Sequence, residues 1–364
     1  VVSGAMAVGI ISYGLFSLPM GWSADRFGPR ITVLVGGLLF GGGTALGAFV
    51  TEAWQLYGLY GLISAAGMGA AWSPLVATVS RWFETNRGLA VGITTLGGGS
   101  GVFFIAPLAE TLIQQLGWRE AYLWLGLISG GLIIGAALLL TRDPAEKNLL
   151  RYGAASLRNP PMRGAVGTDP ARHHTPVAKP SRIARSGLFW RMIMTFGLWW
   201  FAGAITFVQN APFMLEKGLD ATFAAIVVTA FGAGNCAGRV VMGMTCDRLG
   251  ALRAYQLAII VATLAMVGLT LSNGLFAAII VTFMLGFGVG GASTQITTLG
   301  IELYGTKSVG ALMGAILALI SVFGAIGPLI AGVIHDVSHS YTPAYLLGAA
   351  SLWLSLLLSI TLRR

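Results

Sequence analysis

The chain contains 364 residues, of which 55% are hydrophobic and only 10% are charged, with a formal net charge of +9. Soluble domains carry about a quarter charged residues, so this composition excludes an ordinary soluble protein and indicates a chain that lies in lipid. Nucleic-acid binding is excluded as well, because the basic residues are dispersed through loops between apolar segments and do not form one patch.

Eleven apolar runs of about 20 residues follow one another along the chain, and each is long enough to cross a bilayer as a helix. Strands that cross a membrane are shorter and alternate apolar with polar residues. The sequence therefore predicts an all-α membrane protein with eleven spans. The runs cover residues 1–22, 31–50, 54–80, 88–113, 119–141, 188–215, 222–245, 254–272, 274–303, 308–334 and 341–362.

The charges in the loops predict the orientation. If the loop at 23–30 defines one face, that face collects nineteen of the Lys and Arg residues, whereas the opposite face holds two, Arg119 and Lys217. Loops rich in Lys and Arg stay on the cytoplasmic side. We therefore expect a multi-pass protein, in the inner membrane of a bacterium, with a cytoplasmic C-terminus and with Val1 outside.

A polar stretch with several prolines divides the apolar runs into groups of five and six. Its composition predicts a cytoplasmic linker without a packed core. The predicted organisation is an N-terminal bundle, a linker and a C-terminal bundle, at residues 1–141, 142–187 and 188–364.

The two halves repeat. Asp25 and Asp247 are 222 positions apart, and so are Gly88 and Gly310. Internal repeats of this kind are typical of transporters. The second half begins its first helix near residue 188, so the same offset places the corresponding helix upstream of Val1. We therefore expect a twelve-helix protein whose first helix is missing from this chain.

The loop after the first run reads GWSADRFGPR at 21–30, and a second copy reads GMTCDRLGALR at 243–253. These loops resemble the motif of the major facilitator superfamily, G-x-x-x-D-R-x-G-R-R/K. The resemblance implies two pseudo-symmetric six-helix bundles around a central cavity, alternating access, and loops that form a cytoplasmic gate. The matching residues are Gly21, Asp25, Arg26, Gly28 and Arg30 in the first copy and Gly243, Asp247, Arg248 and Gly250 in the second.

Asp25 lies at a predicted membrane boundary, where a carboxylate needs a partner. The candidates are Arg26, Arg81 and the positive N-terminus of the helix that begins near residue 308. Breaking and re-forming such contacts would open and close one side of the cavity. The alternative is that these loops are only turns whose charges set the topology.

The segment 81–101 contains Arg81 and Arg87 and then reads Gly-Leu-Ala-Val-Gly-Ile. It resembles the signature of monocarboxylate porters and of oxalate/formate antiporters, which implies the transport of a small organic anion, above all a monocarboxylate. Arg81 and Arg87 join the predicted gating residues. The G-P-x-x-G-G element of drug–proton antiporters is not present, which disfavours drug export.

Arg239 is the candidate substrate ligand. It precedes Asp247 by eight residues, which places it about 12 Å into a hydrocarbon core about 30 Å thick, where no acidic residue is predicted. A bound anion would neutralise it, and the related families place a substrate-binding Arg in the same G-R-x-x-x-G-x-x-x-D frame. The alternative is an Arg that reaches the cytoplasm or pairs with Asp247.

Other polar residues are candidates for the same cavity. Asn235 lies one helical turn from Arg239, and Tyr13 is its counterpart in the repeat. Gln209 and Asn210 are further candidate ligands, although single polar residues in spans more often bond another helix. No cofactor or metal site is predicted; the partners are the bilayer, a carboxylate substrate and a proton as candidate coupling ion, and a monomer is expected.

Two alternatives to anion transport remain. One is a major facilitator exporter of hydrophobic or drug-like compounds. The other, from a different class, is a membrane-embedded enzyme or receptor; an enzyme would need Ser, His, Glu or metal ligands converging at one depth, and the sequence shows no such cluster, so we do not expect an enzyme.

Overall fold

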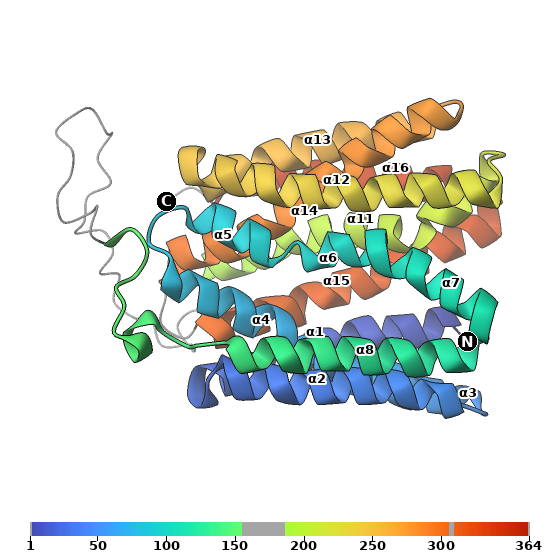
Figure 1. The fold of residues 1–364 in the computed structure, drawn as a ribbon. Helices are drawn as coiled ribbons and strands as arrows, with labels where there is room; N and C mark the ends of the chain where they lie inside the picture. Colours follow the sequence, from blue (N-terminus) through green and yellow to red (C-terminus); the bar gives the residue numbers. More distant parts are fainter. Residues whose placement is uncertain (1, 155–185, 306–308, 363–364) are drawn as a thin grey trace.

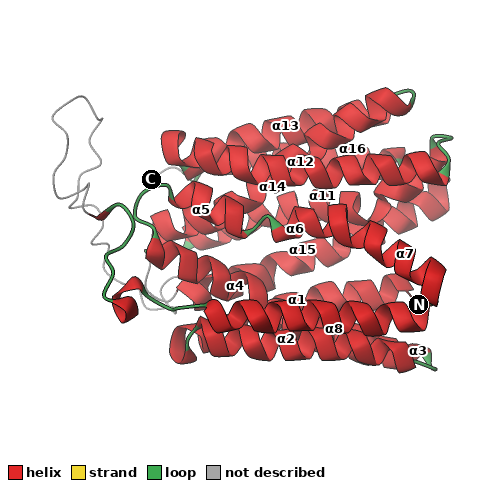
Figure 2. Ribbon diagram, viewed as in Figure 1, coloured by secondary structure: helices red, strands yellow, loops and turns green. Residues whose placement is uncertain are grey.

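The computed structural model describes residues 2–154, 186–305 and 309–362, so most of the predicted linker lies outside the described residues. Every regular element in the described part is a helix, and short loops join the helices (Figure 2). The prediction of an all-α protein is therefore confirmed.

Residues 2–154 form long helices that contain two short π-helical stretches. The elements are α1 (Val2–Phe27), α2 (Pro29–Leu46), η1 (Gly47–Phe49), α3 (Ala53–Leu56), η2 (Tyr57–Ser64), α4 (Ala65–Trp82), α5 (Arg87–Thr94), α6 (Gly97–Ser100), η3 (Gly101–Ile105), α7 (Ala106–Leu116), α8 (Trp118–Leu139) and η4 (Pro144–Lys147).

The rest of the described chain forms six long helices with tight turns. They are α11 (Gly187–Glu216), α12 (Ala221–Leu249), α13 (Ala251–Leu271), α14 (Leu275–Tyr304), α15 (Val309–Ser338) and α16 (Thr342–Ile360).

The long helices run roughly side by side, with α2 and α8 at one edge and α13 at the other (Figure 1). Helices of the two halves meet in the middle of the molecule, where α1 packs against α15 and α5 packs against α12. The centre of the protein is therefore built by both halves of the chain.

The structure contains nine helical segments in its described part that are long and apolar enough to cross a membrane. The predicted count of eleven is not confirmed. The predicted run at 1–22 lies in α1, whereas the run at 88–113 is not one helix but four short elements, from α5 to α7.

The sequence explains the break in this run. Thr95 and Leu96 form a turn, and three consecutive glycines follow at 97–99. Glycine is among the poorest helix formers, and breaks in helices gather at such sites. Hydropathy does not detect the break, because the segment stays apolar throughout.

Glycine also determines how closely α12 and α14 approach. A Cβ atom on Gly238 would lie 2.0 Å from the carbonyl oxygen of Phe287, and one on Gly290 would lie 2.3 Å from that of Asn235. Real Cβ atoms do not come so near, so no larger residue fits without moving the helices apart. Small residues of this kind let membrane helices pack backbone to backbone.

The first residues after α8 fold back onto the loop between α4 and α5. The amide of Tyr152 donates to the carbonyl of Trp82 at 2.8 Å, and the amide of Glu84 donates to the carbonyl of Tyr152 at 2.9 Å. The ring of Tyr152 also packs against Phe83, with centroids 5.4 Å apart. The start of the predicted linker is thus attached to the loop that carries the candidate gate.

Candidate functional site

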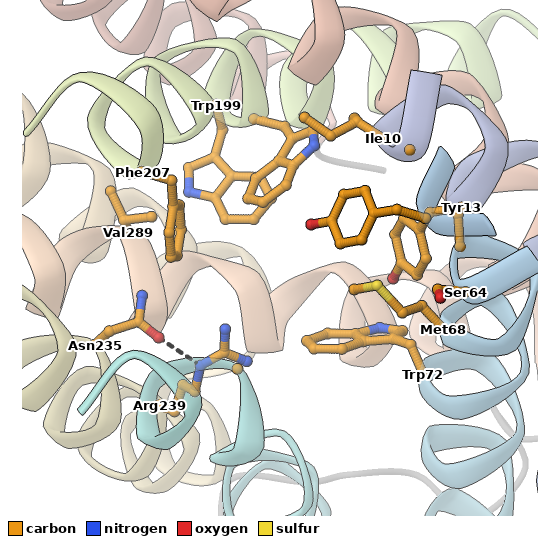
Figure 3. Close-up of a pocket in the computed structure, with 15 residues that line it drawn as sticks. Ile10, Tyr13, Ser64, Met68, Trp72, Trp199, Phe207, Asn235, Arg239 and Val289 are labelled. Atoms are coloured by element: carbon orange, nitrogen blue, oxygen red, sulfur yellow. Dashed lines mark hydrogen bonds between the residues drawn. The ribbon is translucent and has the colours of Figure 1, made fainter. Parts of the chain in front are cut away.

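A cavity of about 310 Å³ lies between the two halves of the chain (Figure 3). Residues from α1, η2, α4 and α6 line it from the first half, and residues from α11, α12 and α14 line it from the second. A smaller cavity of about 80 Å³ shares five of its lining residues, Arg239 among them. One chain therefore forms a central site that both halves share.

Aromatic residues are the largest group in the lining. Six of the fifteen lining residues are aromatic, contributed by both halves: Tyr13, Tyr60, Trp72, Trp199, Trp200 and Phe207. Of these six residues, only Tyr13 is predicted from the sequence as a ligand.

Arg239 and Asn235 form the polar corner of the cavity (Figure 3). The Nε atom of Arg239 donates to Oδ1 of Asn235 at 2.8 Å. The Arg239 side chain is 5% exposed, and its guanidinium carbon lies 5.4 Å from the centroid of the Trp72 ring. The guanidinium is thus held in place from two sides, by an amide oxygen and by an aromatic face.

No acidic side chain of the described residues pairs with Arg239. Asn235 lies one turn from Arg239 on the side away from Asp247, and Asp247 instead accepts backbone hydrogen bonds from the α5 segment. The alternative of an Arg239–Asp247 ion pair is therefore not what the structure shows.

Three nitrogen atoms at the cavity residues are buried and have no hydrogen-bond partner among the described residues: Nη1 of Arg239, Nδ2 of Asn235 and Nε1 of Trp199. All three are donors. A buried donor without an acceptor is costly, so this set of atoms is suited to a ligand that brings acceptor oxygens.

The break between α5 and α7 makes room for this corner. A Cβ atom on Gly98 would lie 2.8 Å from Nη2 of Arg239, and one on Gly99 would lie 2.9 Å from Oδ1 of Asn235. Any side chain at these two positions would displace the polar groups. The irregular backbone thus lies where the cavity needs close approach, as is usual inside membrane proteins.

Two of the other predicted ligands, Gln209 and Asn210, do not line this cavity. Nε2 of Gln209 donates to the carbonyl of Pro328 at 3.4 Å, which is a contact between helices. Asn210 is buried, and its amide has no partner among the described residues. Tyr13 lines the cavity from α1, opposite Asn235 and Arg239 (Figure 3).

Asp25 joins the two halves at one end of the molecule. Its Oδ1 accepts a hydrogen bond from Nη2 of Arg81 at 2.7 Å, and its Oδ2 accepts one from the amide of Ala311 at 2.9 Å. Ala311 lies in the first turn of α15, where the helix dipole attracts an anion. Of the three predicted partners, the structure selects Arg81 and this helix N-terminus, while Arg26 packs over the rings of Trp22 and Phe27.

Asp247 makes the matching contact from the second half of the chain to the first. Its Oδ1 and Oδ2 accept hydrogen bonds from the amides of Gly88 and Leu89 at 2.7 and 2.9 Å, at the start of α5. Gly88 and Leu89 are the repeat counterparts of Gly310 and Ala311. Each half therefore caps a helix of the other half with its own aspartate. For Asp247, this partner was not among the predictions.

Glycines bring the helices together at these contacts. A Cβ atom on Gly21 would lie 2.1 Å from the carbonyl oxygen of Gly310, and one on Gly243 would lie 2.6 Å from that of Gly88. Both glycines were predicted from the motif copies, and both lie where the halves touch.

The remaining motif residues lie around the two aspartates. The Nε atom of Arg87 donates to the carbonyl of Phe83 at 3.1 Å, within its own loop. Arg30 and Arg248 are exposed, and Gly28 adopts a φ of 93° at the turn that starts α2. A positive φ of this size is readily available only to glycine.

The family model of the Major Facilitator Superfamily matches residues 1–328 and, in a second match, residues 211–364. The chain belongs to the major facilitator superfamily. This confirms the resemblance seen in the two motif copies. As a member of the superfamily the chain is a multi-pass integral membrane transporter for small organic substrates and not an enzyme.

Several proteins similar to this chain are monocarboxylate transporters. The chain is 26% identical to monocarboxylate transporter 12 of Xenopus laevis over 94% of this chain and 76% of that protein. It is 28% identical to monocarboxylate transporter 13 of Bos taurus over 93% of this chain and 74% of the relative. Both relatives are vertebrate, so they do not support the expectation of a bacterial membrane.

A solved structure supports the fold. The Escherichia coli fucose:proton symporter superposes on 99% of this chain and 90% of its own, with a TM-score of 0.72 at 17% identity. This major facilitator transporter shares the arrangement of helices, including those that surround the cavity.

Proposed function

We propose that this major facilitator protein transports a small monovalent organic anion, a monocarboxylate, by alternating access, and that Arg239 binds the carboxylate. The observation that supports the proposal most directly is the buried guanidinium of Arg239, which lines the central cavity and has no acidic partner among the described residues. An Arg fork matches the two oxygens of a carboxylate.

Electrostatics favours an anion of single charge. An uncompensated charge in a membrane span costs at least about 2.5–3.5 kcal/mol, and a bound anion would remove much of that cost. Arg239 is the one cationic residue among those that line the cavity. It can neutralise one negative charge of a bound anion, and a second charge on the same anion would have no cationic partner. The names of the relatives, monocarboxylate transporters 12 and 13, agree with this choice.

We propose that the contacts of Asp25 and Asp247 form the gate on the cytoplasmic side. Both aspartates bridge the halves at the same end of the molecule, and the loops at that end carry the predicted excess of basic residues. The moving bodies would be residues 1–141 and 188–364, joined by the linker at 142–187, with the C-terminus cytoplasmic.

A single chain is proposed as the transporting unit, since both halves of one chain line the cavity. Proton coupling stays a prediction. None of the cavity-lining residues is acidic, so a coupling proton would travel on the substrate or through another part of the chain.

The test is uptake of labelled lactate into proteoliposomes, with pyruvate, formate and short hydroxy acids as competitors and oxalate as the dianion control. Arg239→Gln should abolish uptake, because the loss of a charge-assisted contact costs about 1.5–3 kcal/mol. Arg239→Lys keeps the charge but loses the fork, so weak uptake should remain.

Insertion of both variants should be normal, since removing a charge makes a helix easier to bury, and protein recovered from membranes checks this. Uptake by Arg239→Gln at the wild-type rate would refute the assignment. Competition by neutral hydrophobic compounds, with none by carboxylates, would favour the exporter alternative instead.

A further inference from the structure

The cavity is much larger than a short carboxylate. Its volume is about 310 Å³. This is roughly ten times the volume of about 30 Å³ that one water molecule occupies in the liquid. A molecule of the size of lactate would fill a minor part of this space and leave the apolar walls in contact with trapped water or with nothing, and either arrangement is unfavourable.

The charge of the lining is confined to one side. Arg239 is the one charged lining residue and lies beside Asn235, whereas Met68 and the uncharged residues Tyr13 and Ser64 lie across the cavity (Figure 3). A ligand that matches this arrangement has one anionic end and a large apolar body.

Aromatic rings form the walls around that body. Trp199 and Trp200 lie with their ring centroids 5.4 Å apart and their planes at 33°, and Trp200 and Phe207 lie 5.9 Å apart at 58°. These rings come from α11, and Trp72 and Tyr60 complete the lining from the other half. Rings so arranged offer both faces and edges, which is what another aromatic ring packs against most favourably.

We propose that the substrate is an aromatic monocarboxylate, such as an aryl-acetate, with its carboxylate on Arg239 and Asn235 and its ring among Trp199, Trp200 and Phe207. This inference rests on the proposed function, because it assumes that Arg239 binds a carboxylate. It adds the class of the apolar body, which neither the superfamily nor the anion site specifies.

The experiment compares ligands that differ in one property at a time. Proteoliposomes that contain the purified protein take up labelled phenylacetate or labelled lactate at pH 7.5, and protein-free liposomes correct for passive entry. The competitors are indole-3-acetate and phenylacetate as aromatic acids, cyclohexylacetate and hexanoate as non-aromatic acids of similar size, and benzyl alcohol as an aromatic compound without a carboxylate.

The proposal predicts that the aromatic acids inhibit at concentrations about two- to tenfold lower than the non-aromatic acids, as ring–ring packing provides. Benzyl alcohol should inhibit weakly. Phe207→Leu keeps an apolar side chain but removes the ring, so the ratio between cyclohexylacetate and phenylacetate inhibition should fall toward one. Phe276→Leu, at a position in α14 that is 77% exposed and is not among the lining residues, should leave the ratio unchanged.

The outcomes separate the two proposals. Uptake of lactate without inhibition by aromatic acids, or equal inhibition by cyclohexylacetate and phenylacetate, would overturn the aromatic assignment and leave the carboxylate site intact. If no carboxylate is taken up or competes, or if benzyl alcohol competes as well as phenylacetate, the anion function itself fails. A retained aromatic preference in Phe207→Leu, in protein that elutes as the wild type does, counts against the placement of the ring.

Discussion

Replacing Asp25 by Asn tests whether the two aspartates hold one side of the transporter closed. The substitution keeps the size and one acceptor oxygen but removes the charge that pairs with Arg81 and with the start of α15. The side chains of Asp25 and Arg81 are only 16% and 13% exposed, so solvent screens the pair weakly.

The magnitude follows from the contacts. A hydrogen bond to a charged group contributes about 1.5–3 kcal/mol, and Asn would retain part of it. We therefore expect the closed state to lose about 1–2 kcal/mol, which corresponds to an increase of about five- to thirtyfold in the open population.

Cys246 provides the assay. It is 7% exposed, and its Cβ lies 2.9 Å from where a Cβ on Gly88 would be, at the contact between α12 and α5. Opening of the halves at this end would uncover the thiol. The rate of its labelling by a maleimide, in a Cys236→Ser background, should rise by about the same factor as the open population.

Asp25→Asn with an unchanged labelling rate would refute the reasoning and reduce the motif to a turn that sets topology. Arg81→Gln serves as the partner variant. If the two residues act as one pair, the double substitution should raise labelling little more than either single change, because interacting residues are not additive.

Other substitutions test further parts of the structure. Gly21→Ala should hinder closure, because its Cβ would lie 2.1 Å from the carbonyl oxygen of Gly310, and the rate of Cys246 labelling should therefore rise. Gly42→Ala is the control and should leave the labelling rate unchanged, because no described atom lies within 4 Å of its Cβ. Lys217→Met should lower the free energy of unfolding by about 1–2 kcal/mol. The reason is that Nζ of Lys217 donates to the carbonyls of Leu269 and Ser272 at 2.6 and 2.7 Å, at the end of α13. Lys147 is exposed, so Lys147→Met is the control for the loss of a positive charge. An equal change in the free energy of unfolding of the two variants would show that the contact to α13 is not responsible.

The sequence predicted the features that depend on charge. Apolar runs, the repeated aspartate loops and a single arginine inside a span are all visible without a structure, because charges in lipid are rare enough to be informative. The partnership of Asp25 with a helix N-terminus was also predictable from its position. The partnership of Asp247 with the N-terminus of α5 is consistent with the same repeat, although it was not predicted.

The aromatic walls could not be predicted in the same way. A Trp or Phe side chain is stable against lipid and against a cavity alike, so hydropathy does not distinguish Trp199, which is buried, from Trp190, which is exposed. The break at Thr95 and Leu96 was missed for a related reason, since glycine-rich backbone counts as apolar whether or not it is helical. The polarity of Gln209 and Asn210 predicts a partner but does not show the direction of either side chain.

The close approach of α12 and α14 has a consequence for sequence variation. The glycines that the structure describes include two kinds that composition does not separate. At Gly238 and Gly290 every substitution collides with backbone, whereas at Gly131 and Gly135 an added Cβ meets no described atom within 4 Å. A saturation mutagenesis profile should therefore show intolerant glycines along the seam between α12 and α14 and permissive ones at Gly131 and Gly135 of α8. Such a profile would map the packed seams of the transporter without any measurement of transport.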